Sequence, residues 1–166
     1  MKFRCERDHL VEALGAAGRA VANRGGALPV LAGVRAELTG NRLKLTGSDL
    51  ELTIAVELEV AGERDGVAVL PSKIASDLVR SLGDPRVEVS VEGDEAHITA
   101  GRFESSLRLL PADEFPRLAM PADEAVTLAA RDFAAALHQV VSAASADDAR
   151  PILTGVLMAA EDGGLR

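Results

Sequence analysis

The chain has 166 residues, of which 48% are hydrophobic and 27% are charged, and its formal net charge at pH 7 is −8. This composition excludes the disordered class, and no apolar run reaches the roughly 18 residues that a membrane-spanning helix needs. The N-terminus also lacks the apolar core of a signal peptide, so we expect a cytoplasmic protein with no membrane partner.

The first third of the chain is predicted to form a strand, a helix and an antiparallel hairpin. Residues 2–7 read as a strand in which the single cysteine, Cys5, is a small buried hydrophobe. Asp8 is expected to be the N-cap of the helix. Residues 30–38 are predicted to form a second strand that turns back at 39–41. The apolar stripe predicted for the helix consists of Leu10, Leu14, Ala17 and Val21.

The middle of the chain carries the clearest strand, since polar and apolar residues alternate without exception over residues 51–60. Residues 61–66 are expected to be a loop before a short strand at 67–70. Pro71 is predicted to open a second helix. Inward-facing residues of that helix are expected to be Ile74, Leu78 and Leu82, and outward-facing ones Lys73, Asp77 and Arg80.

Further alternating segments complete an α+β unit of two helices packed on about eight antiparallel strands. These strands are expected near residues 87–91, 96–100 and 103–109. The proline-rich segment 111–124 reads as an extended connector. A strand near Val126-Thr127-Leu128 and a helix starting at Asp132 are expected to follow, with Phe133, Leu137, Val140 or Val141, and Ala144 facing inward.

An internal repeat links the two ends of the chain. Leu28-Pro29-Val30-Leu31-Ala32-Gly33-Val34 resembles Arg150-Pro151-Ile152-Leu153-Thr154-Gly155-Val156, 122 positions later. The upstream helices match at a spacing of 123, so the second copy has one residue fewer between its two blocks. A duplicated domain explains this pattern. Gly33 and Gly155 are then expected at equivalent strand positions where a bulge or a close backbone approach excludes a side chain.

No residue set predicts catalysis, a metal site or a cofactor. The histidines His9, His97 and His138 lack the spacing of metal ligands, and solvated or packed histidines explain them better. The carboxylates of Asp49, Glu51, Glu57 and Glu59 fit the wet face of a half-buried sheet. Neither glycine pair, 25–26 or 163–164, lies between a strand and a helix as a phosphate loop does.

Four motifs in one order carry a resemblance that covers the whole chain. They are residues 45–52 (LTGSDLEL), residues 70–73 (LPSK), residues 110–118 (LPADEFPRL) and the repeated block with the pattern Pro-(Val/Ile)-Leu-x-Gly-Val. In this order and spacing they resemble the bacterial DNA polymerase III β subunit family of sliding clamps. The resemblance implies a DNA-clamp fold and a head-to-tail homodimeric ring around duplex DNA, with helices lining the hole and sheets forming the rim. It implies a non-catalytic processivity factor.

The resemblance also assigns domains and sites. It implies a first clamp domain over residues 1–118, a connector over 119–125 and an incomplete second domain over 126–166. The implied partners are duplex DNA, a second copy of the chain, DNA polymerase III subunits, the clamp loader and other proteins with clamp-binding motifs. Implied site residues are Arg24, Lys73 and Arg80 for DNA, Ile74, Leu78, Arg102, Phe103, Ser105 and Leu107 for the subunit interface, and Leu153, Thr154 and Gly155 for the client-peptide pocket.

Two alternatives stay open at this point. A truncated clamp relative could bind clamp partners without encircling DNA, and we expect residues 1–166 alone not to close the normal ring. An enzyme of unknown chemistry is the more distant hypothesis. The acidic loop at residues 146–149 departs from a DNA-contacting surface, because phosphate binding depends on Lys and Arg.

Overall fold

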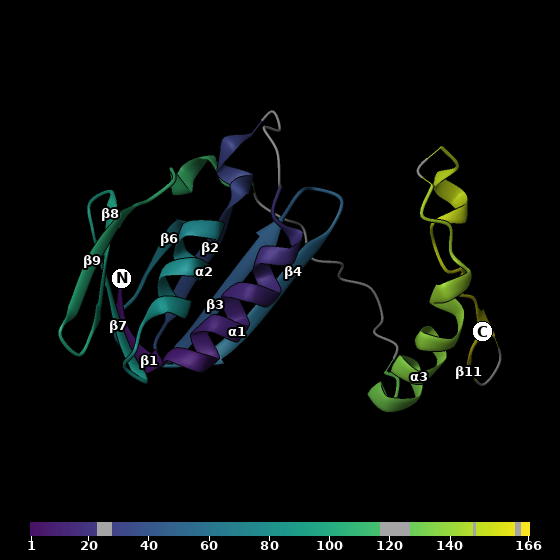
Figure 1. The fold of residues 1–166 in the computed structure, drawn as a ribbon, viewed down its shortest axis with the longest axis horizontal. Helices are drawn as coiled ribbons and strands as arrows, with labels where there is room; N and C mark the ends of the chain where they lie inside the picture. The colour runs from purple at the N-terminus through teal and green to yellow at the C-terminus, as the bar shows by residue number, and fades with distance from the viewer. Residues whose placement is uncertain (23–27, 117–126, 148, 162–163) are drawn as a thin grey trace. The chain divides into compact units, whose positions relative to one another are not determined.

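The computed structural model describes residues 1–22, 28–116, 127–147, 149–161 and 164–166 (Figure 1). The chain divides into two compact units, residues 1–118 and residues 119–166. None of the helices in the described ranges is long and apolar enough to cross a membrane.

The first unit is an α+β fold of two antiparallel sheets with helices packed on them, as predicted. One sheet has the order β5-β1-β7-β8-β9, and the other has the order β4-β3-β2-β6. The helices α1 (Arg7–Ala17) and α2 (Ser72–Ser81) contact each other and lie side by side in Figure 1. The strands are β1 (Lys2–Glu6), β2 (Gly33–Thr39), β3 (Arg42–Ser48), β4 (Thr53–Glu59), β5 (Ala61–Arg64), β6 (Gly66–Pro71), β7 (Arg86–Glu92), β8 (Glu95–Ala100) and β9 (Phe103–Arg108).

The unit consists of two similar halves that exchange their first strands. Each half runs strand, helix and three strands: β1-α1-β2-β3-β4 and β6-α2-β7-β8-β9. Strand β1 lies in the sheet of the second half, paired with β7 from Lys2↔Ser90 to Glu6↔Arg86. Strand β6 lies in the sheet of the first half, paired with β2. Each sheet is therefore completed by a strand from the other half.

Helix α1 buries the predicted stripe but begins earlier than predicted. Leu10, Leu14 and Ala17 are at most 2% exposed, and Val21 beyond the helix is 9% exposed. The expected N-cap at Asp8 is wrong, because β1 passes directly into the helix at Arg7, whose backbone N–H donates to Pro85 O at 2.7 Å. Asp8 lies in the first turn, and its carboxylate pairs with Arg7 at 2.7 Å.

Helix α2 turns a different face inward from the one predicted. Ala75, Val79 and Leu82 are at most 3% exposed, whereas Ile74 is 61% exposed and Leu78 is half-buried. The expectation that Ile74 points inward is therefore wrong. The smaller side chains at 75 and 79 face the core because α2 packs against both α1 and the sheet strands.

The segment after β4 is a strand rather than the predicted loop. Residues Ala61–Arg64 form β5, which pairs with β1 through Phe3↔Gly62. Its sequence shows no alternation. Gly62 lets the backbone of the turn between β2 and β3 come close to β5, because a Cβ at Gly62 would lie 1.8 Å from Gly40 O. Strand β4 begins at Thr53, and consequently Leu52 is 51% exposed instead of joining the dry face.

A second small core closes the unit at its C-terminal end. Val30, Leu31, Val69 and Phe115 form a cluster in which each is at most 6% exposed. Residues Ala112–Glu114 form a 3₁₀ turn that brings Phe115 into it. The first part of the expected extended connector is thus packed on the unit, and residues 119–125 lie outside the described residues.

The second unit repeats α1 and the two 3₁₀ turns that follow it in the first unit. Helix α3 (Ala130–Val140) and the 3₁₀ turn Val141–Ala143 match α1 and Gly18–Ala20 at a spacing of 123. The 3₁₀ turns Pro29–Ala32 and Pro151–Leu153 match at 122. Ala22 N donates to Leu31 O at 3.0 Å, and Ser145 N donates to Leu153 O at 2.8 Å. These shared bonds support the predicted duplication.

Some expectations for the second unit are wrong or fall outside the described residues. Val126 is not described, and residues 127–129 form no strand. Phe133 and Leu137 are half-buried, whereas Val140 and Val141 are 45% and 54% exposed. The unit ends in a short hairpin of β10 (Ala160–Glu161) and β11 (Gly164–Leu165).

The two repeat glycines differ. A Cβ at Gly33 would lie 2.5 Å from Val69 Cγ1 and 3.1 Å from the backbone oxygen of Leu70, so a side chain is excluded there as expected, mainly by side-chain packing. Gly155 lies in a bend and has no atom within 4 Å of such a Cβ. The expectation of an equivalent, closely packed strand position therefore holds for Gly33 and is wrong for Gly155.

Candidate functional site

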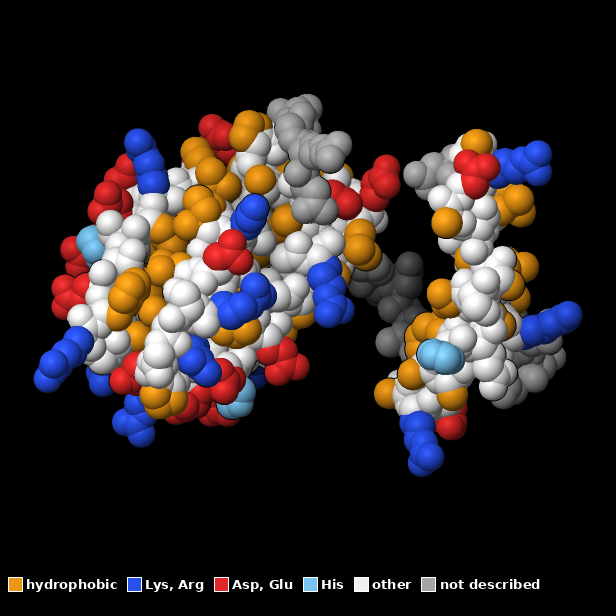
Figure 2. Space-filling model, viewed as in Figure 1, with side chains coloured by type: hydrophobic (Ala, Val, Ile, Leu, Met, Phe, Trp, Pro, Cys, Tyr) orange, Lys and Arg blue, Asp and Glu red, His pale blue; other side chains and the backbone are white. Residues whose placement is uncertain are grey.

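A groove of about 420 Å³ runs between α1 and α2 on the face that the two helices present. The helices approach closely because small residues line their contact: a Cβ at Gly18 would lie 3.0 Å from Ser72 Oγ. Basic and acidic side chains lie together over these helices in Figure 2. The lining residues are Leu14, Gly15, Gly18, Arg19, Val21, Ala22, Ala32, Ser72, Lys73, Ser76, Asp77 and Arg80.

The charged lining of this groove is mainly basic. Arg19, Lys73 and Arg80 are exposed, and Asp77 is the acidic residue among them. Asp77 Oδ1 lies 3.6 Å from Arg80 Nη1, and both side chains are more than 60% exposed. Among the described residues, neither Arg19 nor Lys73 has an ion-pair partner. The groove therefore offers solvated cations to an approaching anion.

The structure thus brings two of the three expected DNA-facing residues, Lys73 and Arg80, to one groove. The third, Arg24, lies outside the described residues. Arg19 joins the set from the 3₁₀ turn Gly18–Ala20 that follows α1. Asp77, which the sequence analysis placed only on the outer face of α2, was missed as part of the site. Its spacing from Lys73 and Arg80, at i+4 and i−3, is the signal that could have found it.

The expected interface residues at β9 differ in how far their side chains are exposed. Phe103, Ser105 and Leu107 lie on β9, which pairs only with β8 among the described strands. Phe103 is 43% exposed, but Leu107 is 6% exposed and belongs to the main core. Leu107 therefore has no free side chain to offer a partner. Arg102 lies in the turn before β9, where Gly101 adopts φ +60°.

The expected client-pocket residues follow one another at a 3₁₀ turn of the second unit. Leu153 is 50% exposed, and its carbonyl accepts the bond from Ser145 N. The Thr154 hydroxyl donates to Pro151 O at 2.7 Å, so it is used within the turn. In the neighbouring acidic loop, the Asp147 carboxylate accepts from Ala149 N at 3.0 Å, and residue 148 lies outside the described residues.

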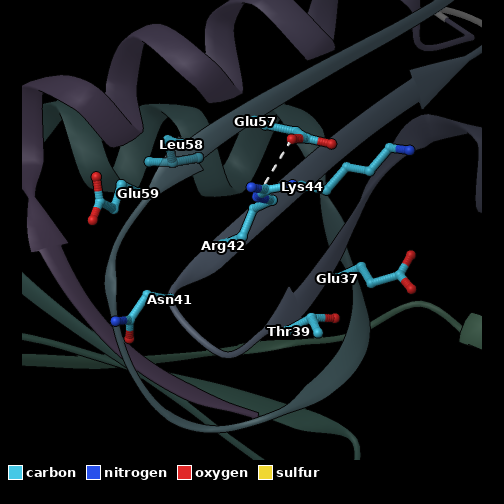
Figure 3. Close-up of a pocket in the computed structure, with 8 residues that line it drawn as sticks. All are labelled: Glu37, Thr39, Asn41, Arg42, Lys44, Glu57, Leu58 and Glu59. Carbon is cyan, nitrogen blue, oxygen red and sulfur yellow. Dashed lines mark ion pairs between the residues drawn. The ribbon is translucent and has the colours of Figure 1, made fainter.

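The outer face of the four-stranded sheet bears mixed charges around an open hollow of about 880 Å³ (Figure 3). Arg42 Nε lies 3.7 Å from Glu57 Oε2 across β3 and β4. The remaining lining residues are Glu37, Thr39, Asn41, Lys44, Leu58 and Glu59. None of these is a histidine or cysteine, and within the described residues no group of three His, Cys, Asp or Glu could hold a metal ion.

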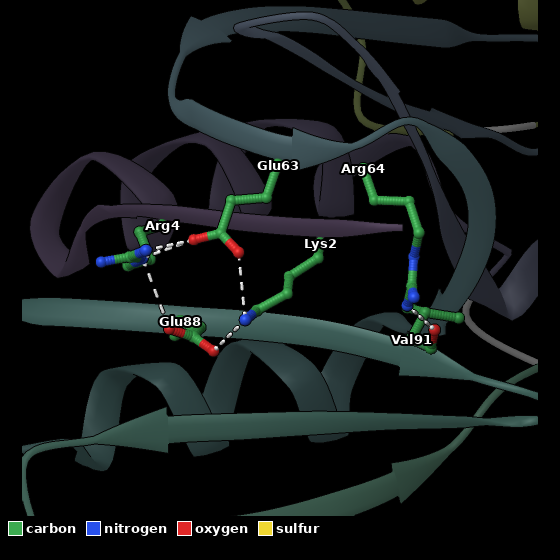
Figure 4. A network of polar contacts seen from close by, with 6 residues as sticks. All are labelled: Lys2, Arg4, Glu63, Arg64, Glu88 and Val91. Carbon is green, nitrogen blue, oxygen red and sulfur yellow. Dashed lines mark hydrogen bonds and ion pairs between the residues drawn. The ribbon is translucent and has the colours of Figure 1, made fainter.

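The five-stranded sheet carries a cross-strand ion-pair network (Figure 4). Lys2 Nζ lies 3.0 Å from Glu63 and 3.1 Å from Glu88, and Arg4 pairs with the same two carboxylates. The hydrogen bond from Arg4, followed by that from Lys2, lowers the pKa of Glu63. These two carboxylates are thus already paired with lysine and arginine.

Cys5 has no reactive character. Burial, and to a lesser degree the nearby Glu6 carboxylate, raises the pKa of its thiol to about 12. A thiol with this pKa remains protonated at neutral pH and is a poor nucleophile.

The family model of the DNA polymerase III beta subunit N-terminal domain matches residues 1–119. The chain belongs to the DNA polymerase III beta subunit family. It is 35% identical over 156 residues to the beta sliding clamp of Streptomyces coelicolor, and this match covers 94% of this chain and 41% of that protein. It is 33% identical over 156 residues to the beta sliding clamp of Micrococcus luteus, covering 94% of this chain and 50% of that one.

Solved structures of this family share the fold. The DNA polymerase sliding clamp from Bacillus subtilis superposes with a TM-score of 0.90 and 30% identity, covering 99% of this chain and 46% of that chain. This agreement confirms the predicted clamp fold. The chain spans half or less of the length of the beta subunit relatives named here.

Proposed function

We propose that this chain is part of a cytoplasmic sliding clamp that closes head to tail as a homodimeric ring around duplex DNA. The clamp holds the replicative polymerase on its template and catalyses no reaction itself. Membership of the DNA polymerase III beta subunit family supports this function. The observation that carries the DNA assignment is the set of exposed cations in the groove between α1 and α2.

The groove has the properties that a sliding contact needs. Lys and Arg side chains attract phosphates through a term that is independent of base sequence. Arg19, Lys73 and Arg80 are exposed, and the small residues between them leave room for water. Such contacts are weak, so a ring can move along the duplex while its closed shape prevents dissociation. Arg24, which lies outside the described residues, belongs to the proposed surface by the family resemblance.

The open edge of β9 is the proposed contact with a second copy of the chain. Unpaired strand edges are the natural sites for sheet continuation between chains. Phe103 and Ile74 expose apolar side chains on this unit, and Leu78, Ser105 and Arg102 complete the proposed surface. Leu107 contributes through its backbone only, because its side chain is in the core.

The client-peptide pocket is proposed to begin at Leu153, Thr154 and Gly155. The exposed side chain of Leu153 and the open space at Gly155 can receive an apolar peptide residue. The proposed ligands are short segments of DNA polymerase III subunits, of the clamp loader and of other proteins with clamp-binding motifs.

A double charge reversal, Lys73→Glu with Arg80→Glu, tests the DNA assignment. Duplex affinity should fall equally on two unrelated sequences, since no side chain is placed to contact base edges. The plot of log affinity against log salt should become less steep, with its negative slope reduced in magnitude by roughly 0.9 for each lost phosphate contact. Fluorescence anisotropy with labelled duplexes at several salt concentrations measures both quantities.

The matched control is Arg86→Glu with Arg108→Glu, which changes the net charge equally at two side chains of the five-stranded sheet that are 86% and 83% exposed. This control should retain most of the affinity and the full salt slope. Circular dichroism should show both variants folded, because exposed substitutions usually shift stability by about 0.5 kcal/mol or less. Equal loss of affinity in the two variants would refute the groove as the DNA-facing surface.

A further inference from the structure

Asp77 is placed where it opposes the groove's own cations. It lies one helical turn from both Lys73 and Arg80, and positions three and four apart share a face of a helix. All three residues line the groove between α1 and α2. A carboxylate therefore lies within the surface that presents the cations of the first unit.

The fold has little need for this carboxylate. Asp77 lies in the second turn of α2, away from the N-cap at Pro71. Its described contact is the 3.6 Å pair with Arg80, in which the two side chains are 61% and 63% exposed. Exposed pairs of this spacing are weak and are screened by salt. The position of Asp77 matters more to an anion in the groove than to the stability of the helix.

We infer that Asp77 limits the affinity of the groove for the phosphates of duplex DNA, so that the contact stays weak enough to slide. This role rests on the proposed function of the groove. With Asp77 ionised, the four charged lining residues sum to a smaller positive charge than the three cations alone. Asp77 also forms an ion pair with Arg80, and the guanidinium of Arg80 must leave this pair before its whole charge can act on a phosphate.

The variant Asp77→Asn tests this role in the present chain. It keeps the size and shape of the side chain and removes the negative charge. At low ionic strength its affinity for a duplex of arbitrary sequence should rise about two- to fivefold, the effect of one unit charge a few ångströms away in water. The gain should shrink as salt is added. Fluorescence anisotropy provides the affinities, and circular dichroism checks that the variant is folded.

Asp94→Asn is the matched control. Asp94 is also exposed and also pairs with an arginine, Arg108, at 3.3 Å, but it lies in the turn between β7 and β8. Both substitutions change the net charge of the chain by the same amount. A gain in the Asp77 variant that exceeds the gain in the Asp94 variant supports the inference. Equal gains, or weaker binding by the Asp77 variant because the carboxylate positions Arg80, would overturn it.

The charge-reversal variant described above separates this inference from the function on which it rests. If Lys73→Glu with Arg80→Glu leaves duplex affinity unchanged, the groove does not bind DNA and both ideas fail. If that variant binds weakly while Asp77→Asn behaves like Asp94→Asn, the groove assignment stands and the role of Asp77 is overturned. A second substitution, Asp77→Ser, should give the same gain as Asp77→Asn if charge is the cause.

Discussion

Leu31 and Leu153 occupy equivalent positions in the internal repeat, and the backbone carbonyl of each accepts a hydrogen bond from the equivalent partner, Ala22 or Ser145. Their side chains nevertheless differ tenfold in exposure, at 5% and 50%. Leu31 packs with Val30, Val69 and Phe115, whereas the described part of the second unit supplies no such cluster around Leu153. The local backbone is thus repeated, but its packing is not.

Alanine substitution at these two positions should separate packing from backbone geometry. Leu31→Ala should reduce the free energy of unfolding by about 2–5 kcal/mol, because it leaves a cavity in a buried cluster. Leu153→Ala should reduce it by about 1 kcal/mol or less. Urea unfolding followed by circular dichroism measures both. Similar losses at the two sites would contradict the difference in packing.

The two repeat glycines offer a second matched pair. Gly33→Ala places a methyl group 2.5 Å from Val69 Cγ1 and 2.8 Å from Leu110 Cδ1, so the neighbours must shift. Overpacking of this kind should lower the free energy of unfolding by about 1–3 kcal/mol. Gly155→Ala meets no atom within 4 Å and should leave stability unchanged. Thermal unfolding of the two variants against the parent chain checks this; a destabilised Gly155 variant would argue against the open site.

Strand β9 should show two kinds of side chain when Phe103 and Leu107 are each replaced by alanine. Leu107→Ala should destabilise the chain by about 2–5 kcal/mol, since the residue is 6% exposed in the core. Phe103→Ala should lower stability by about 1 kcal/mol or less, because its ring is 43% exposed. Chemical unfolding curves distinguish the two. The opposite order would mean that Phe103 is a core residue and Leu107 a surface residue.

The Cys5 thiol should make stability sensitive to alkaline pH. Its pKa is raised in the fold from 9.0 to about 12, which favours the protonated thiol in the folded state. As pH rises, the unfolded chain loses this proton first. The contribution of the protonated thiol to the free energy of unfolding is therefore fully present below pH 9.0 and is lost as pH rises toward 12.

Alkylation with iodoacetamide at mildly alkaline pH reports the same shift directly. The folded chain should react slowly and the urea-unfolded chain quickly, since the thiolate is the reacting species. Cys5→Ser should abolish labelling in both states. Equal rates for the folded and unfolded chains would show that the thiol is not protected.

The sequence predicted those features that depend on local pattern. The apolar stripe of α1, most of the alternating strand segments along the chain and the one-residue difference between the repeats follow from spacing alone. Ile74 was misplaced because α2 has two apolar stripes that share Leu82, and close helix packing favoured the one with smaller residues. Strand β5 was missed because its four residues, Ala-Gly-Glu-Arg, show no alternation of polar and apolar side chains.

The candidate site was predictable in part for the same reason. Lys73 and Arg80 were placed on the outer face of α2 by helical spacing, and the groove confirms that both line one surface. Their meeting with Arg19, from the 3₁₀ turn after α1, depends on how two helices pack. The pairing of Asp77 with Arg80 depends on which rotamers result. Helical periodicity contains neither piece of information.

The exchange of first strands between the two halves determines the order in which the two sheets can form during synthesis. Strand β1 is made first and can pair with β5, but its other partner β7 ends at Glu92. Closing such a long loop is slow, and this pairing gains nothing until both strands are present. The four-stranded sheet, by contrast, is complete once β6 ends at Pro71. A ribosome-bound chain that has exposed Pro71 but not Glu92 should therefore gain protection from proteases in the four-stranded sheet before β1 at the amino terminus is fully protected.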